Sequence, residues 1–148
     1  MDTLKVKRLT ETATLPTRAT EGDAGLDLYA DKAVYLSQGE WRAVSTGIAV
    51  EIPVGYVGLV HPRSGLAARH GITVLNTPGT IDAGYRGEVK VILAKILGQP
   101  DTTLPFRIKP GDRIAQLVIQ EVALPEIEEV EELTESIRGV NGFGSTGS

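Results

Sequence analysis

Short apolar runs separated by glycine and proline dominate the hydrophobic pattern of this 148-residue chain. Its 17 glycines and 8 prolines leave segments rich in Val, Ile and Thr between them. In residues 24–30, for example, Leu26, Leu28 and Ala30 alternate with Asp27 and Tyr29. Alternation of period two is typical of a strand with one buried face, and short strands between frequent turns indicate a β-sandwich or barrel. The pattern therefore predicts a single all-β domain.

The same criteria predict the individual strands. We expect strands at residues 5–9, 24–30, 46–52, 56–60, 71–75, 89–96 and 106–109, and a turn feeding a strand at 111–119. Residues 34–36 and 41–44, on either side of Gln38–Gly39, suggest a hairpin, and residues 98–103 suggest a polar turn.

Residues 61–71 break the β pattern. Ser64 is a suitable N-cap, and Gly71 suits the position just past a helix end, so we expect one helix of about two turns. Its first-turn amides point toward Arg63 and Ser64, where they could hold a phosphate. A plain helix cap beside a surface arginine would explain the same residues.

Residues 76–88 lie between two apolar, β-branched runs and contain one proline and three glycines, which predicts a wide hairpin loop that forms a pocket. Asn76 offers a donor and an acceptor, as recognition of a base edge requires. Asp82 could accept a proton from water, and Tyr85 adds a rigid ring with a polar tip. Alternatively, Asp82 is an Asx-turn residue, Tyr85 packs on the hairpin and Asn76 ends a strand.

After residue 121 the pattern changes. Leu124, Ile127, Val130 and Leu133 are spaced among five glutamates, which indicates a charged face on a terminal strand or frayed helix. Residues 138–148 are glycine-rich, so a disordered tail is the default expectation. Glycine amides with Ser and Thr hydroxyls could nevertheless wrap a phosphate, and Arg138 could clamp it with two hydrogen bonds.

Composition narrows the function. The absence of cysteine excludes disulfides and thiolate metal sites, so any metal must be held by oxygen. A net charge of −4 argues against direct nucleic-acid binding over a broad surface. The first residues lack the apolar core of a signal peptide and no apolar run is long enough to span a membrane, so we expect a cytoplasmic protein without membrane contact.

The stretch Gly79–Glu88 resembles the third motif of the trimeric dUTPase family. The four other motifs of that family follow in order, over nearly the whole chain: Ala24–Ala30, Pro62–Ala67, Gly111–Ile119 and Arg138–Gly147. Asn141 departs from the fifth motif, in which glycine is common at this position. Five motifs in the family's order and spacing identify the chain as similar to dUTPases.

The resemblance implies a distorted jelly-roll-like β-clip fold in residues 1–137, assembled as a homotrimer with active sites between subunits. Residues 122–133 would form an arm that reaches a neighbouring subunit, and 138–148 a flexible tail that closes over the nucleotide. The implied reaction is Mg2+-assisted hydrolysis of dUTP to dUMP and pyrophosphate. Such a reaction keeps uracil out of DNA and supplies dUMP for thymidylate synthesis.

The resemblance also implies roles for individual residues. Asp82 is the general base, Asn76, Thr80, Ile81 and Lys90 read uracil, and Tyr85 packs under the deoxyribose. Asp27 helps hold magnesium through water, and the substrate phosphates supply the other ligands. The remaining binding residues contact the phosphates or stack on the base: Arg63, Ser64, Gly65, Gln116, Arg138, Phe143, Gly144, Ser145 and Thr146. His61 and His70 receive no role.

Two other functions are considered. A dCTP deaminase resembles this fold but has a catalytic Glu in its central loop, where this chain has Asp82 and Tyr85. A nucleotide-sensing module would bind dUTP to switch a protein interface without turnover. Release of pyrophosphate separates these functions from dUTP hydrolysis.

Overall fold

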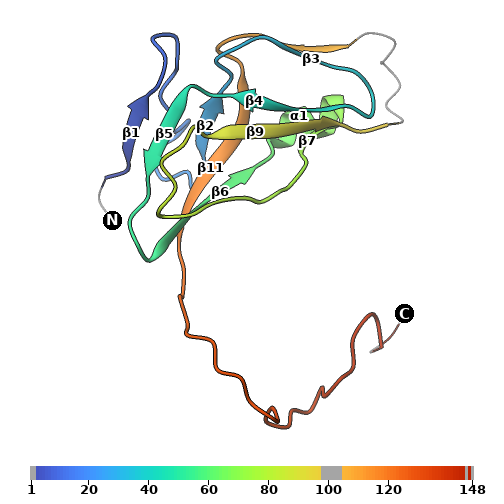
Figure 1. Ribbon diagram of the computed structural model, residues 1–148. Helices are drawn as coiled ribbons and strands as arrows, with labels where there is room; N and C mark the ends of the chain where they lie inside the picture. Colours follow the sequence, from blue (N-terminus) through green and yellow to red (C-terminus); the bar gives the residue numbers. More distant parts are fainter. Residues whose placement is uncertain (1–2, 98–104, 146, 148) are drawn as a thin grey trace.

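The computed structural model describes residues 3–97, 105–145 and 147. These residues form eleven strands and one helix, which confirms the predicted all-β class with a single short helix (Figure 1). In chain order the elements are β1 (Lys5–Arg8), β2 (Leu26–Tyr29), β3 (Val34–Leu36), β4 (Trp41–Ser45), β5 (Ile48–Glu51), β6 (Tyr56–His61), α1 (Ser64–His70), β7 (Ile72–Val74), β8 (Gly79–Ile81), β9 (Lys90–Lys95), β10 (Phe106–Ile108) and β11 (Arg113–Glu121).

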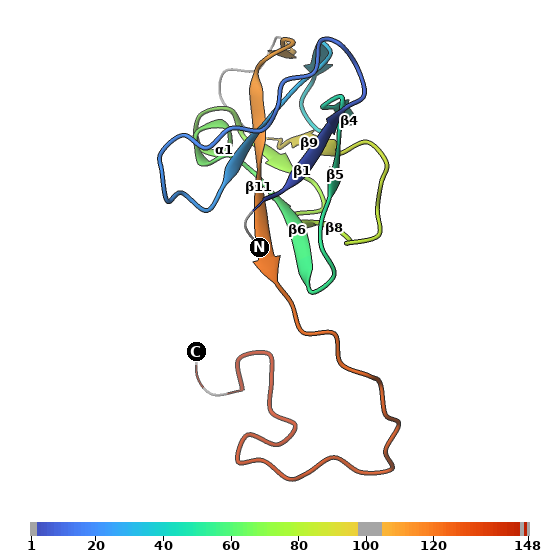
Figure 2. The same cartoon turned by 90° about the vertical axis from the view of Figure 1, so that its left-hand side faces the viewer.

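The strands pair across long sequence distances. One sheet has the order β2-β11-β6-β8 and another β4-β9-β7, and two strand pairs, β1-β5 and β10-β3, complete the body. All of these pairings are antiparallel. Strand β11 lies between β2 and β6, as Figures 1 and 2 show, so the last strand is central in the largest sheet. This interleaving is the jelly-roll-like arrangement that the resemblance to dUTPases implies.

The core lies between the apolar faces of these sheets. Leu28 on β2 and Leu117 on β11 are fully buried, as are Val91 and Leu93 on β9. Ile92, between the last two, is only half-buried because successive side chains of a strand point to opposite faces. On β2, the buried Leu28 lies between the half-buried Asp27 and Tyr29, which confirms the period-two pattern predicted at residues 24–30. On the surface, Lys5 of β1 bonds Glu51 of β5 at 2.9 Å and lowers the pKa of that carboxyl.

One expected hairpin is wrong and another is confirmed with an added strand, since β7 and β9 pair across residues 76–88. Residues 34–36 and 41–44 do not pair with each other, because β3 pairs with β10 and β4 pairs with β9. The turn between them is closed by the Glu40 carboxylate, which accepts the Ser37 N–H (2.9 Å), and it directs the two strands into different sheets. Residues 76–88 are more than a loop, because β8 within them pairs with β6. The turn expected at 98–103 lies outside the described residues.

The helix α1 has the expected length of about two turns, but its start is one residue earlier than predicted. Arg63 is the N-cap, in an extended conformation (φ −89°, ψ 128°) and without a side-chain capping bond, so Ser64 is the first helical residue. Because residues 56–61 form a strand and Pro62 follows, the chain stays extended up to Arg63. Gly71 ends the helix in the left-handed region (φ 60°), and its N–H bonds the Ala67 carbonyl.

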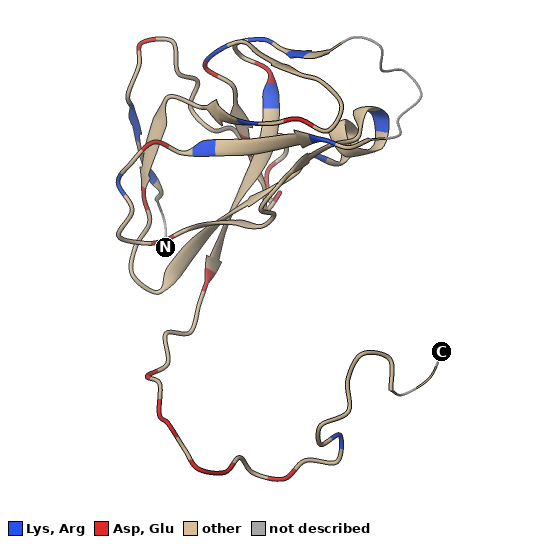
Figure 3. Cartoon of the chain, turned by 45° about the vertical axis from the view of Figure 1, so that its right-hand side comes forward, with Lys and Arg blue, Asp and Glu red and all other residues tan. Residues whose placement is uncertain are grey.

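Beyond β11 the chain leaves the body. Val122 donates to the Gly55 carbonyl (2.8 Å), and no hydrogen bond joins 123–145 to the body within the described chain. The expected terminal strand or frayed helix is absent from these residues, which run away from the sheets in Figures 1 and 2. The apolar side chains of this segment lie away from the core, and Ile127 is 94% exposed. Figure 3 shows that acidic residues line this segment.

No helix in the described parts of the chain is long and apolar enough to cross a membrane.

Candidate functional site

A first group of predicted residues meets where β2, β11 and β6 lie side by side. Gln116 on β11 is opposite Asp27 on β2 and opposite His61 on β6, so the first, second and fourth motifs converge. The Asp27 carboxylate, with its side chain 14% exposed, lies 3.8 Å from Arg63 Nε and 3.5 Å from Arg113 Nη1. We call Asp27, Arg63, Arg113 and Gln116 the Asp27 group.

Two further contacts order this group. Arg63 Nη1 donates to the Arg113 carbonyl (3.2 Å), and Gln116 Nε2 donates to the Pro62 carbonyl (3.3 Å). A Cβ added at Gly25 would lie 2.3 Å from Gln116 Oε1, so glycine there makes room for the amide. The Asp27 group therefore presents two guanidinium groups and one amide around a single carboxylate, beside the start of α1.

Ser64 and Gly65 form the first turn of α1, directly after Arg63. A Cβ at Gly65 would lie 2.7 Å from Arg69 Nη2, so this glycine allows the Arg69 guanidinium to lie against the helix backbone. Ser64 and Gly65 follow Arg63 within the second motif. Folding brings this motif next to Asp27 of β2, which belongs to the first motif.

A second group lies in the predicted hairpin pocket, which the structure confirms as a hollow of about 360 Å³. Thr80, Ile81, Asp82, Tyr85 and Lys90 all line it. Asn76 is exposed and does not line this hollow, although it lies next to Gly79, where an added Cβ would be 3.3 Å from Asn76 Nδ2. We call these six residues the hairpin group.

Tyr85 is fixed within the hairpin. Its hydroxyl donates to the Glu88 carbonyl (2.9 Å), and its ring covers Gly87, where a Cβ would meet the hydroxyl at 2.5 Å. Glu88 is held in turn, because its carboxylate accepts the Gly47 N–H (3.0 Å) and lies 3.8 Å from Lys90 Nζ. One face of the ring is therefore occupied by the hairpin, while the side chain as a whole remains 47% exposed.

The Asp82 carboxylate is open to water. Its residue is exposed, and its backbone carbonyl, not its side chain, accepts the Tyr85 N–H (3.0 Å) that closes the turn. Among the described residues the carboxylate has no hydrogen-bond or ion-pair partner. The Asx-turn explanation of Asp82 is therefore not supported, and the carboxylate is free to accept a proton.

The two groups are far apart within one chain. Strand β6 places Val60 opposite Gly79 and Gly58 opposite Ile81, so Asp82 continues past the Gly58 side of β6. Arg63 follows the other end of the same strand. At a rise of about 3.3 Å per residue, the Cα atoms of Asp82 and Arg63 are separated by roughly 15 Å or more. The base-side and arginine-side residues of one chain therefore do not form one cleft.

The tail residues join neither group. Arg138 Nε donates to the Asn141 carbonyl (2.9 Å), and the Ser145 N–H bonds the Gly142 carbonyl (3.1 Å), so these contacts are local. Phe143 is fully exposed with φ 52°, a backbone conformation unusual for a residue other than glycine. Gly144 lies in the same turn, and Thr146 lies outside the described residues.

Sequence reasoning missed two residues that support the site. Arg113 shares the Asp27 carboxylate with Arg63, and Glu88 holds both Tyr85 and Lys90. Arg113 lies within the fourth motif and Glu88 within the third, so their place in these motifs could have identified them. Their partners come from other strands or from a hairpin geometry that spacing alone does not specify.

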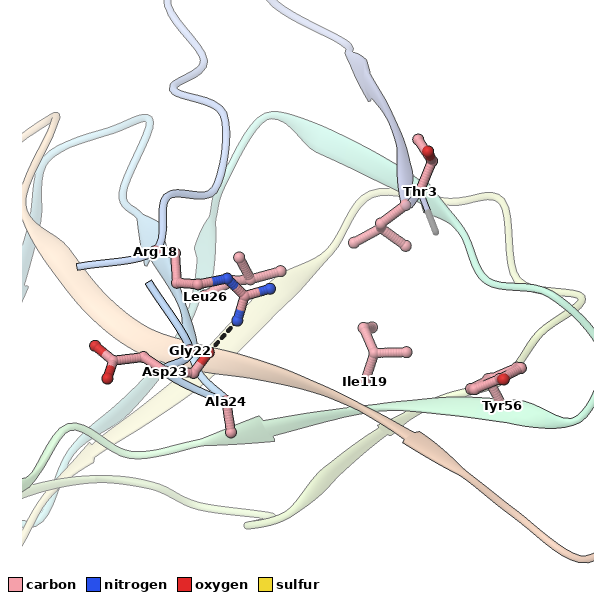
Figure 4. A pocket seen from close by; sticks show the side chains of 9 residues that line it. Thr3, Arg18, Gly22, Asp23, Ala24, Leu26, Tyr56 and Ile119 are labelled. Atoms are coloured by element: carbon pink, nitrogen blue, oxygen red, sulfur yellow. Dashed lines mark hydrogen bonds between the residues drawn. The ribbon is translucent and has the colours of Figure 1, made fainter. Parts of the chain in front are cut away.

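Another hollow, of about 430 Å³, contains none of the predicted site residues. Figure 4 shows it between the N-terminal segment and the β2 side of the sheet, with the Arg18 guanidinium bonded to the Asp23 carbonyl. It is lined by Thr3, Leu4, Arg18, Gly22, Asp23, Ala24, Leu26, Tyr56 and Ile119.

A metal would find few protein ligands. The described residues contain no group of three or more Asp, Glu, His or Cys side chains that could hold a metal ion. Asp27 supplies a single, mostly buried carboxylate, 3.8 Å from Arg63 Nε. This donor set fits a hard cation that keeps several waters and takes its other ligands from a substrate.

Comparison with known proteins places this geometry in a family. A family model described as dUTPase matches residues 11–147. The deoxyuridine 5'-triphosphate nucleotidohydrolase of Mycolicibacterium gilvum (strain PYR-GCK) is 54% identical over 149 residues, which cover 97% of this chain and 94% of that protein.

Solved structures agree. The dUTPase of Staphylococcus bacteriophage 80alpha, determined with dUPNHPP, is 36% identical with a TM-score of 0.89, and the match covers 100% of both chains. A mutant dUTPase from phage phi11 of S. aureus, described for its coordination of a structural Mg(II) ion, is 33% identical with a TM-score of 0.82 and covers 90% of this chain and 100% of its own. The fold, the order of the motifs and these matches together show that the chain belongs to the dUTPase family, the enzymes that hydrolyse dUTP.

Proposed function

We propose that this enzyme converts dUTP to dUMP and pyrophosphate by attack of an Asp82-activated water on the α-phosphorus. The observation that carries the mechanism is the unpartnered Asp82 carboxylate at the edge of the hairpin pocket. A carboxylate without a cation or hydrogen-bond donor of its own can accept a proton from a water held between it and the substrate. The product dUMP serves thymidylate synthesis, and removal of dUTP keeps uracil out of DNA.

The hairpin group recognises the nucleoside. Asn76 and the backbone of Thr80, Ile81 and Lys90 offer donors and acceptors to the uracil edge. Contact of the base with the pocket wall, which Thr80 and Ile81 help to form, disfavours the methyl group of thymine. Tyr85, pinned to Glu88, is a rigid platform for deoxyribose that leaves no room for a 2′-hydroxyl.

The Asp27 group recognises the phosphates. Arg63 and Gln116 supply donors, and the first turn at Ser64 and Gly65 supplies backbone amides. From the tail, Arg138, Gly144, Ser145 and Thr146 add phosphate contacts while Phe143 stacks on the base. Donors placed where negative charge develops lower the barrier of phosphoryl transfer.

Magnesium fits this arrangement. Asp27 would hold the ion through water, and the substrate phosphates would supply the other ligands. When bound, the ion neutralises charge on the phosphate oxygens. Asp27 also holds Arg63 and Arg113 at the phosphate end through its two oxygens.

The site is completed between subunits of a homotrimer. The separation of Asp82 from Arg63 within one chain supports this proposal, because one substrate must contact both. The extended arm at 122–133 has no hydrogen bond to its own body beyond Val122 within the described chain, which supports exchange of the tail with a neighbour. We propose that residues 1–137 form the domain and 138–148 the mobile tail.

Pyrophosphate release measured with dUTP, dTTP, dCTP and UTP tests the proposal. We expect turnover of dUTP alone at low micromolar substrate, and an Asp82→Asn variant that binds dUTP but loses at least about 10²-fold in rate. Conversion of dCTP to a uracil nucleotide would indicate a deaminase instead. Binding of dUTP without pyrophosphate release would indicate a sensor, and near-normal turnover by the Asn variant would remove Asp82 as the base.

A further inference from the structure

Lys95, at the end of β9, is a buried lysine outside the predicted site. Its residue is 3% exposed, its ammonium donates to the His70 carbonyl (3.1 Å), and it lies 5.9 Å from the centre of the Phe106 ring. A buried ammonium is costly unless hydrogen bonds and an aromatic face compensate for lost water. This lysine therefore has a specific contact at the C-terminal end of α1.

Few side chains of α1 pack against the body, and a backbone bond from the Ile96 N–H to the Gly71 carbonyl (2.9 Å) also joins its C-terminal end to the end of β9. None of its residues is buried, and only the half-buried Leu66 packs against the core. The His70 ring contacts the Phe106 ring in a tilted arrangement, with centroids 4.7 Å apart and an interplanar angle of 45°. Because the last carbonyls of a helix lack partners and carry partial negative charge, the Lys95 ammonium both satisfies one of them and fixes that end to β9.

The other end of the same helix carries Arg63. The Arg63 carbonyl accepts the Ala67 N–H (3.0 Å), which ties the Arg63 backbone to the helix. Arg63, Leu66 and Phe106 also line one hollow of about 280 Å³. A shift of α1 at His70 therefore moves Arg63 relative to Asp27 and Arg113, since a two-turn helix moves as one unit.

We propose that Lys95 is a positioning residue for the triphosphate end of the substrate, acting through α1 on Arg63. This inference rests on the proposed phosphate role of the Asp27 group. Ile92 is the residue of β9 nearest to Lys95 that lines the hairpin pocket, and it lies three residues away, so about 10 Å separates Lys95 from the pocket that holds the base. Its loss weakens contacts to phosphates and leaves recognition of the base unchanged.

The test compares affinities of the full-length protein for a non-hydrolysable dUTP analogue and for dUMP. Lys95→Met keeps the apolar stem and removes the ammonium. We expect its Kd for the triphosphate analogue to rise about tenfold and its Kd for dUMP to change by less than about twofold. Hydrogen exchange should be faster in residues 64–71 and unchanged in β2.

Two controls make the result specific. Val50→Ala shortens a buried side chain on β5, away from α1. It shows how general destabilisation changes the ratio of the Kd values for the triphosphate analogue and for dUMP. Arg63→Gln reports the phosphate role itself. The quantity compared is the ratio of the Kd for the triphosphate analogue to the Kd for dUMP. If Arg63→Gln changes this ratio but Lys95→Met leaves it at the value of wild type or of Val50→Ala, the inference is overturned. If Arg63→Gln also leaves the ratio unchanged, the inference fails together with the proposed phosphate role.

Discussion

Sharing of the site between subunits can be tested by mixing two inactive variants, Asp82→Asn and Arg63→Gln. Asp82 and Arg63 follow opposite ends of β6, roughly 15 Å or more apart within one chain. A nucleotide α-phosphate cannot contact both at hydrogen-bond distance. We therefore expect each active site to take Asp82 from one subunit and Arg63 from another.

The expected magnitude follows from assembly. In a cyclic trimer refolded from equal amounts of both variants, an intact Asp82 beside an intact Arg63 needs two independent choices, so about a quarter of the sites recover. Loss of a general base costs about 10²–10⁴-fold, and loss of a phosphate-binding arginine is similarly severe. Each single variant alone should therefore keep about 1% of wild-type activity or less, whereas the mixture should recover about a quarter of it.

The assay is the rate of pyrophosphate release after refolding, with subunit exchange verified by native mass spectrometry. As a control, wild type is mixed with a chain carrying both substitutions. Sites shared between chains again give about a quarter of full activity, whereas sites within one chain give about a half. If the two single variants exchange subunits and the mixture stays as inactive as its parents, Asp82 and Arg63 act within one chain and the shared site is wrong.

Three further predictions follow from individual contacts. Tyr85→Ala removes the platform pinned at Glu88, so UTP turnover should rise relative to dUTP, and an unchanged ratio would place sugar recognition elsewhere. Phe143→Trp should change its emission when a dUTP analogue and magnesium are added, because the exposed side chain becomes covered; a constant spectrum at saturation would exclude stacking. Gly25→Ala should displace Gln116 and weaken dUTP binding by about two- to tenfold with little change in Tm, and normal affinity would show that Gln116 is dispensable.

The sequence by itself determined the fold class and most of the local structure. Period-two alternation identified the buried face of β2, and Gly71 identified the helix end, because these signals depend on residues close together in the chain. The motifs also named the candidate residues, since the chemistry of a carboxylate, an arginine or a glycine is visible without coordinates. The start of α1 was misplaced by one residue because Ser64 suits both the N-cap and the first helical position.

Only the tertiary structure decided which distant segments meet. The pairing of β3 with β10 and of β4 with β9 depends on long-range hydrogen bonds, which local spacing does not encode. The same holds for Asp27 beside Arg113, and for the separation of Asp82 from Arg63 along β6. In the sequence, Lys95 is an ordinary residue of the strand predicted at 89–96, and nothing nearby in the chain indicates that it is buried. Its burial against the His70 carbonyl arises because β9 and the end of α1 are brought together by folding.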